Sequence, residues 1–225
     1  DVFSILKHIS TDTYFAVEEQ SKSGNKADLY LLRLSQFQQD NTTVFGNLIF
    51  RQDIFLLPQK RGFSLRLRYR KNSLLNNQLI SGSERRYRSE YSIRLRTSVA
   101  SRTTSEFQYA REIKTRRDFG VDRFHLISHN SSFILANRPR PPLELRIQFQ
   151  GNHDTDRQNG ITAILIGIVP RLTYSFRGKG RARFEIDWSQ VRSSSTNFYL
   201  PFEMVNGKPA GHSARWTGAM DYRLG

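Results

Sequence analysis

The chain contains no cysteine, so a disulfide framework, a thiolate-bound metal and a thiol nucleophile are all excluded. It also lacks any run of about 20 apolar residues, which excludes a membrane-spanning α-helix. A β-strand crosses a bilayer with only about ten residues, half of them polar. The absence of long apolar runs therefore leaves a β-type membrane protein open.

Acidic residues are scarce relative to basic ones, at 20 Asp and Glu against 35 Lys and Arg, for a net charge of +15. Such an excess favours nucleic acid, anionic lipid or another polyanion as a partner. The 225 residues suit one β domain over 1–225, with a poorly defined N-terminal segment over 1–26. The chain starts at Asp1 without a Met or a secretory segment, so we expect a processed or excised chain, truncated at its ends.

The segment from Ile161 to Val191 carries the clearest pattern. Apolar side chains occupy even positions on both sides of a Gly-rich break at 177–180, and charged side chains alternate with them after the break. A strand places successive side chains on opposite faces. This segment therefore predicts a long β-hairpin with one apolar face and one charged face.

Most of the chain repeats this alternation. Further strands are predicted over 28–37, 44–57, 63–70, 91–99, 107–113, 124–136, 143–149 and 216–224, and Phe198, Leu200 and Phe202 continue the pattern. Residues 1–17 fit either a helix or a strand, while 20–26, 71–88 and 151–160 have the composition of polar loops. We expect about ten to twelve antiparallel strands in an all-β, up-and-down arrangement without a crossover helix.

Two architectures explain this alternation. In a soluble sandwich the apolar faces form a core, and in a membrane barrel they meet lipid while the polar faces line a lumen. The predicted strands exceed the usual five to six residues, follow one another in sequence, and carry aromatic residues near their ends. These features favour the barrel, because aromatic side chains concentrate at membrane interfaces. The aromatic residues expected to face lipid or form girdles are Phe63, Tyr69, Tyr91, Tyr174, Phe176, Phe184, Trp188, Trp216 and Tyr222.

The dyad alternation with aromatic flanks over residues 27–224 resembles an outer-membrane β-barrel of Gram-negative type, at the level of the class alone. The resemblance implies an antiparallel, up-and-down transmembrane β-barrel in a bacterial outer membrane, or a sector of a larger barrel. Such barrels commonly end on an aromatic residue, and this chain ends on Leu224-Gly225. We therefore expect it to be cut from a longer chain.

Arginines on the polar faces provide the strongest functional signal. The predicted basic ladder of the lumen comprises Arg66, Arg68, Arg94, Arg96, Arg146, Arg181, Arg183, Arg215 and Arg223. A cationic lumen favours anions, whereas cross-strand pairing with Glu144, Glu185, Asp187 and Asp221 makes the same arginines a stabilising network. Both interpretations stay open at this stage.

Sites for chemistry are weak in this sequence. The cluster His153-Asp154-Thr155-Asp156 has residue types that activate water or hold calcium, but its composition is typical of a turn. His125 and His129 lack a third metal ligand. We expect no catalytic residues, no metal and no cofactor, and we do not expect an enzyme.

The sequence thus predicts an outer-membrane barrel for transport or conduction: a porin-like pore, an uptake channel or part of a secretion translocon. The expected partners are membrane lipid, anionic solutes and other subunits of an outer-membrane complex, with the loops 71–88 and 151–160 as gates. The alternative is a soluble basic β-sandwich that binds a polyanion such as nucleic acid. Nucleic acid is not expected, because stacking on single strands needs aromatic and cationic side chains on the same face.

Overall fold

The computed structural model describes residues 9–21, 43–56, 62–78, 82–176, 179–195 and 200–222. Ten strands account for most of them. Their bounds are β1 Ile9–Ser21, β2 Thr43–Leu56, β3 Phe63–Gln78, β4 Gly82–Ala100, β5 Thr103–Asp118, β6 Val121–Arg140, β7 Leu143–Asp156, β8 Ile161–Phe176, β9 Gly180–Ser193 and β10 Gly211–Tyr222. A single 3₁₀ turn, η2 (Val205–Gly207), is the only helical element among the described residues.

All ten strands belong to one sheet, in the order β1 to β10, and each pairs antiparallel with its neighbours in sequence. The prediction of an all-β, antiparallel, up-and-down fold is therefore confirmed. The strand count matches the lower end of the predicted range within the described part of the chain. There, β1 and β10 form the two edges of the sheet.

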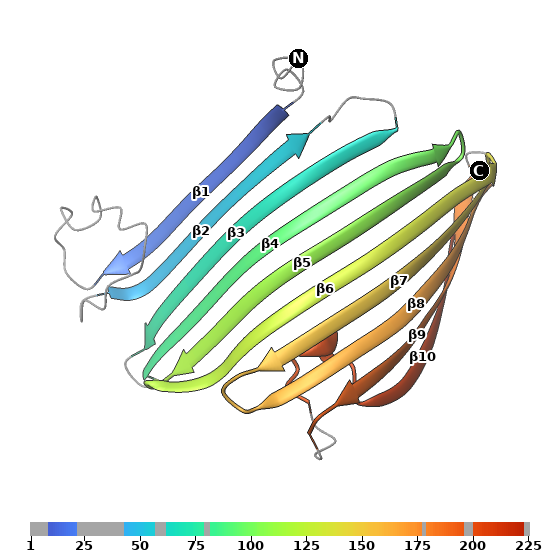
Figure 1. The fold of residues 1–225 in the computed structure, drawn as a ribbon. Helices are drawn as coiled ribbons and strands as arrows, with labels where there is room; N and C mark the ends of the chain where they lie inside the picture. The colour runs from blue at the N-terminus through green and yellow to red at the C-terminus, as the bar shows by residue number, and fades with distance from the viewer. Residues whose placement is uncertain are drawn as a thin grey trace.

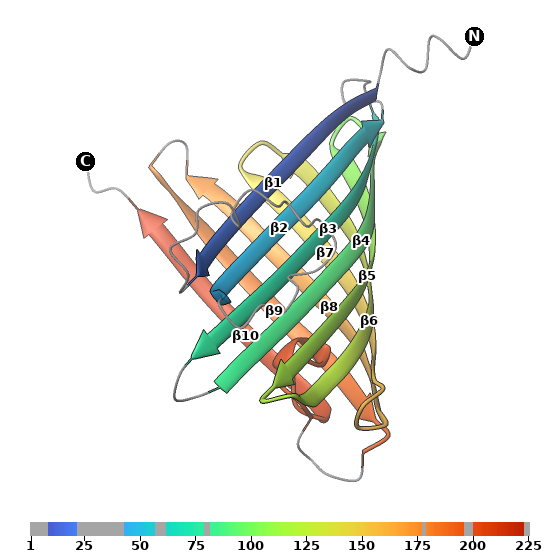
Figure 2. The ribbon, with the colours of Figure 1, turned by 90° about the vertical axis from the view of Figure 1, so that its left-hand side faces the viewer.

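The sheet curls strongly across its width. Figure 1 views its convex side, with β8 to β10 turning away behind β7, and Figure 2 shows β1 and β10 at the two sides of the resulting trough. Residues 200–210 of the β9–β10 connection, which carry η2, lie inside this trough (Figure 2). The described strands thus form one curved layer rather than the two stacked sheets of a sandwich.

The two ends of the trough carry different connections. At one end, two-residue turns at 101–102 and 141–142 join β4 to β5 and β6 to β7. At the opposite end lie the turns at 119–120 and 157–160 and the described residues, 194–195 and 200–210, of the longer β9–β10 connection (Figure 1). Below, these are the short-turn end and the long-connection end.

Several predicted loops are wrong, because strands continue through them. β3 extends to Gln78 and β4 begins at Gly82, so most of 71–88 is strand, and β7 extends to Asp156 through half of 151–160. Both faces are largely polar in these segments, so the alternation disappears while the backbone ladder continues.

The remaining differences lie near the chain's two ends. Residues 9–17 form a strand, which decides between the two structures expected there, and the strand predicted at 28–37 lies outside the described residues. Leu200 and Phe202 belong to the β9–β10 connection and to no strand. The two residues are spaced as on one face of a strand, but they lie in a loop that folds back onto the sheet.

Candidate functional site

Register assigns each strand side chain to one face of the trough, because directly opposed residues point the same way. One row illustrates the convex face. It crosses six strands from β4 to β9 as Leu95, Phe107, Phe133, Phe149, Ile168 and Trp188. Seven strands share an unbroken apolar row when Leu65 of β3, opposite Leu95, is included.

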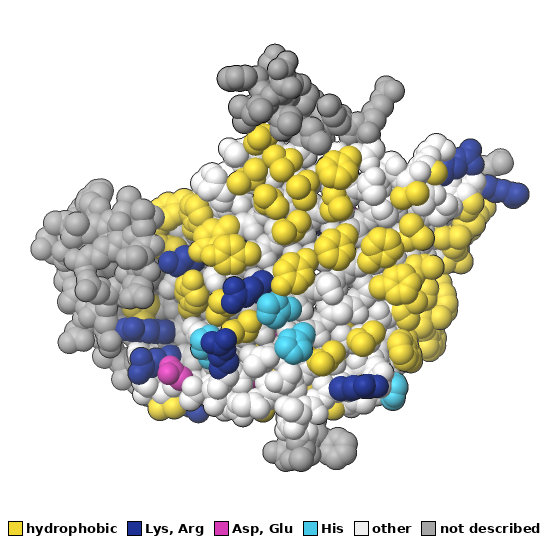
Figure 3. All heavy atoms as spheres, in the orientation of Figure 1, with side chains coloured by type: hydrophobic (Ala, Val, Ile, Leu, Met, Phe, Trp, Pro, Cys, Tyr) yellow, Lys and Arg dark blue, Asp and Glu magenta, His cyan; other side chains and the backbone are white. Residues whose placement is uncertain are grey.

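The convex face divides into two halves. Near the short-turn end it is apolar and well exposed, as at Ile166 (60% exposed), Met220 (68%) and Trp216 (75%). Towards the long-connection end, lysine, arginine and histidine side chains replace the apolar ones over the lower part of the face (Figure 3). Below, these are the convex apolar half and the convex polar half.

The predicted girdle residues all lie on the convex face by their register, including Tyr222 opposite Gly180 and Phe63 opposite Thr97. Tyr69 and Tyr91 stack at 4.7 Å between ring centroids, at the boundary between the two halves. Tyr174 and Phe176 pack edge to face at the opposite margin, beside the short turns. The sheet thus brings aromatic pairs to two levels of one apolar surface.

Eight of the nine predicted ladder arginines lie on the concave face, and Arg223 is outside the described residues. The concave face also carries nearly all of the described strand carboxylates. Among strand carboxylates whose side chains the structure describes, the one that register places on the convex face is Asp122, beside the β5–β6 turn. Acidic side chains are thus almost confined to the inside of the trough.

Asp53 of β2 shows how the concave charges are arranged. Its carboxylate is fully buried (0% exposed) and accepts hydrogen bonds from Arg66 at 2.6 Å and Arg68 at 2.7 Å, with Arg51 at 3.5 Å. A buried carboxylate is tolerated only when it is paired and hydrogen-bonded. Two of the predicted ladder arginines, Arg66 and Arg68, therefore form ion pairs with the buried carboxylate of Asp53.

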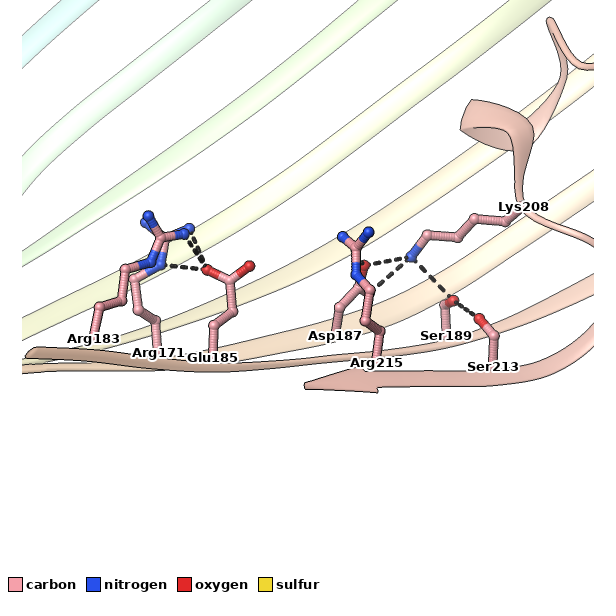
Figure 4. Close-up of polar contacts among 8 residues, drawn as sticks. All are labelled: Arg171, Arg183, Glu185, Asp187, Ser189, Lys208, Ser213 and Arg215. Atoms are coloured by element: carbon pink, nitrogen blue, oxygen red, sulfur yellow. Dashed lines mark hydrogen bonds and ion pairs between the residues drawn. The ribbon is translucent and has the colours of Figure 1, made fainter. Parts of the chain in front are cut away.

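Other ladder arginines are paired in the same manner. Figure 4 shows Glu185 of β9 between Arg171 of β8 and Arg183, each at 2.6 Å. Arg94 contacts Glu106 at 2.8 Å across β4 and β5. Much of the ladder is thus an ion-pair network, as one of the two sequence interpretations proposed.

Arg96 and Arg146 are exceptions, since neither forms an ion pair with a described residue. Both line a concave cavity of about 340 Å³ near the short-turn end, together with Arg102 and Arg138. The Nε of Arg146 is buried without a hydrogen-bond partner within the described part of the chain. Glu106 and Glu144, the acids of this cavity, are already paired with Arg94 and Arg138. The cavity therefore keeps uncompensated positive charge.

The β9–β10 connection packs against the concave face at the other end. Met204 and Val205 are buried at 1% and 0% exposure against Leu126, Leu165 and other residues of the small apolar core. The core comprises Leu126, Ala163, Leu165, Val191, Met204 and Val205. The connection therefore covers a buried apolar patch on the largely polar concave face.

Two polar contacts fix the connection to the sheet. The Val205 backbone N–H donates to Asp154 at 2.5 Å, and Asp154 is 1% exposed. Lys208 donates to Asp187 at 2.8 Å and to Ser189 at 3.0 Å, and Arg215 approaches Asp187 from β10 (Figure 4). The connection is thus bonded to β7 and β9 and narrows the inside of the trough.

The segments predicted as gating loops are largely strand, and the β9–β10 connection was not singled out from the sequence. The available signal was its composition: an apolar Met204-Val205 pair beside Asn206-Gly207-Lys208, in a stretch without alternation. Asp154 lies in the cluster predicted as a turn, yet it is a buried strand residue. Its strand neighbour His153 faces the convex side, opposite His129.

The histidines are not gathered into a metal site. His129 is bonded to the hydroxyl of Tyr109 at 2.7 Å, and its ring lies 6.2 Å from that of His153. Within the described residues, no group of three or more His, Asp or Glu side chains is placed to hold a metal ion. Nor is any described helix long and apolar enough to cross a membrane.

Comparison with protein families found no family model that matches this chain, and none of the curated proteins matches it either.

Proposed function

We propose that this chain forms the wall, or a sector of the wall, of a bacterial outer-membrane β-barrel for transport or conduction. Its convex apolar half faces lipid and its charged concave face lines an aqueous passage. The opposite chemistry of the two faces of one curled sheet carries this proposal. In a soluble protein an apolar surface of this extent would be covered.

The dimensions of the apolar half support a membrane location. On β4 the convex side chains from Tyr91 to Val99 span nine residues, and on β10 those from Ala214 to Tyr222 span nine as well. A tilted strand crosses the hydrocarbon core with about 9–11 residues. The height of the apolar half along the strands therefore matches the hydrocarbon core of a bilayer.

The connections support an orientation. In outer-membrane barrels short turns face the periplasm and longer loops face outwards. By this rule the short-turn end is periplasmic, and the β9–β10 connection folds into the passage from the outer side. The cavity with Arg96 and Arg146 then lies near the periplasmic mouth, where it favours anionic solutes.

The alternative of a soluble basic β-sandwich that binds a polyanion fits the structure less well. A basic sheet binds single-stranded nucleic acid through cations and aromatic rings on one face. Here the aromatic rows occupy the convex face, while the ladder arginines occupy the concave one. Nucleic-acid binding is therefore not proposed.

Reconstitution tests the proposal. The full-length chain should need detergent for extraction, shift its gel mobility on heating and give discrete conductance in planar bilayers. An Arg96→Gln/Arg146→Gln variant should conduct with a lower preference for anions over cations. Arg111→Gln/Arg192→Gln on the convex face loses the same two charges and provides the control. A chain that stays soluble without detergent would remove the proposal.

A further inference from the structure

A second basic cavity opens on the other face of the sheet. Its volume is about 420 Å³, and it lies on the convex polar half over β3, β4 and β5. Four cations are among its lining residues. By register Arg86 points to the concave face, whereas Lys71, Arg85 and Arg117 point to the convex face, one from each strand. Hydroxyl groups stand between them, on Ser73, Tyr87 and Thr115, which follow one another in register across the three strands.

Two of these cations, Arg85 and Arg117, are held close together, and Arg85 forms no ion pair with a described residue. Arg85 and Arg117 are direct partners across β4 and β5, and like charges in that position destabilise a sheet. One amino group of Arg85, Nη2, is buried and makes no hydrogen bond within the described residues. Nothing in these strands offsets the repulsion at Arg85.

Among the described residues lining the cavity, Asp122 is the one carboxylate, and it is a weak partner. Its carboxylate lies 3.6 Å from Nε of Arg117, and both side chains are more than half exposed. The same Nε donates to the Gly120 carbonyl at 2.8 Å. An exposed ion pair of this length contributes little. The site therefore has room and donors for an additional anion.

The position of the cavity indicates where that anion comes from. Tyr69 and Tyr91, at the margin of the convex apolar half, are the next convex residues after Lys71 and Ser89. The Lys71 ammonium lies over the Tyr87 ring at 5.8 Å, at the entrance from the apolar half. Acyl chains covering the apolar half would place their headgroups at this level.

We propose that this cavity binds the phosphate group of an anionic membrane lipid, whose acyl chains lie along the convex apolar half. Arg85 and Arg117 donate to the phosphate oxygens, Lys71 supplies a third charge, and the hydroxyls of Ser73 and Thr115 complete the set of donors. Arginine and phosphate form strong charge-assisted hydrogen bonds. This inference rests on the proposed membrane location.

Lipid binding by the purified full-length chain tests the inference. Native mass spectrometry in neutral detergent would measure the retention of phosphatidic acid, of diacylglycerol with the same chains, and of inorganic phosphate alone. The test variant is Arg85→Gln/Arg117→Gln, and the matched control is Arg70→Gln/Arg96→Gln on the concave face. Both lose two positive charges.

The wild type and the control should retain phosphatidic acid at least roughly tenfold more tightly than the test variant, since two charge-assisted hydrogen-bond donors are lost. Diacylglycerol should not be retained. Equal retention by wild type and test variant, or an equal loss in the control, overturns the site. If inorganic phosphate binds as tightly as phosphatidic acid, the claim that the bound phosphate belongs to a lipid is overturned.

Detergent requirement and heat-shifted gel mobility are measured on the same preparations. If both are present and phosphatidic acid is not retained at the cavity, this inference alone fails. If both are absent, the proposed membrane function fails as well.

Discussion

The convex apolar half and the convex polar half belong to the same strands, yet their side-chain patterns differ. In the apolar half, β4 alternates exposed Tyr91 and Ile93 with concave charges such as Arg94. In the polar half the same strand carries Arg85 and Tyr87 outwards and Glu84 and Arg86 inwards. The hydrogen-bonded ladder is continuous through both. The difference shows that the side-chain pattern changes along the strands while the backbone pairing does not.

The largest expected effect is a charge placed in the apolar half. Phe149→Arg should lower the free energy of unfolding in lipid vesicles by about 2–4 kcal/mol, because arginine at mid-bilayer depth is poorly solvated. His153→Arg, four residues along the same face of β7, should cost only about 0–1 kcal/mol. Urea titration of the two vesicle-inserted variants measures the difference. Equal costs for both variants would contradict the division into halves.

Removing a buried carboxylate behind the apolar half should come next. Asp53→Asn leaves Arg66 and Arg68 facing each other, and we expect a loss of about 1–3 kcal/mol, below the cost of a fully buried pair because both arginines are partly exposed. Glu84→Gln, behind the polar half, should cost less, since Glu84 is itself partly exposed to water. Unfolding of both variants under the same conditions checks the order, and a larger loss for Glu84→Gln would reverse it.

A smaller effect is expected from the β9–β10 connection. Lys208→Met removes its contacts with Asp187 and Ser189 and should destabilise its attachment by about 0.5–1.5 kcal/mol while leaving the strands intact. Protease cleavage within residues 200–210 should become faster, and single-channel conductance should rise. Lys179→Met, in the short β8–β9 turn, is a control of the same charge change. Unaltered cleavage and conductance would show that the connection does not narrow the passage.

The same comparison explains what the sequence predicted. Alternation located the strand cores in the apolar half, so the all-β fold and the faces of residues such as Phe184 and Arg183 followed from it. It failed from Lys71 to Gln78 and from Gly151 to Asp156, where largely polar side chains on both faces remove the contrast between them. A polar stretch in a strand and a polar loop have the same composition, and only pairing with the neighbouring strand distinguishes them.

The site was only partly predictable for a related reason. The ladder arginines were found on one face, but their partners depend on register. Asp53 was not singled out, although it holds Arg66 and Arg68. The basic cavity of Arg85 and Arg117 was hidden inside a predicted loop. The inward packing of Met204 depends on Leu126 and Leu165, which are distant in sequence.

The most direct test is to ask which side chains of β10 meet lipid. Because the chain has no cysteine, single cysteines from Ala214 to Tyr222 can be spin-labelled one at a time in bilayers. Even positions should be accessible to oxygen dissolved in lipid, and odd positions to a water-soluble nickel chelate. A strand whose even positions are open to the chelate, or shielded from both reagents, would contradict a lipid-facing convex surface.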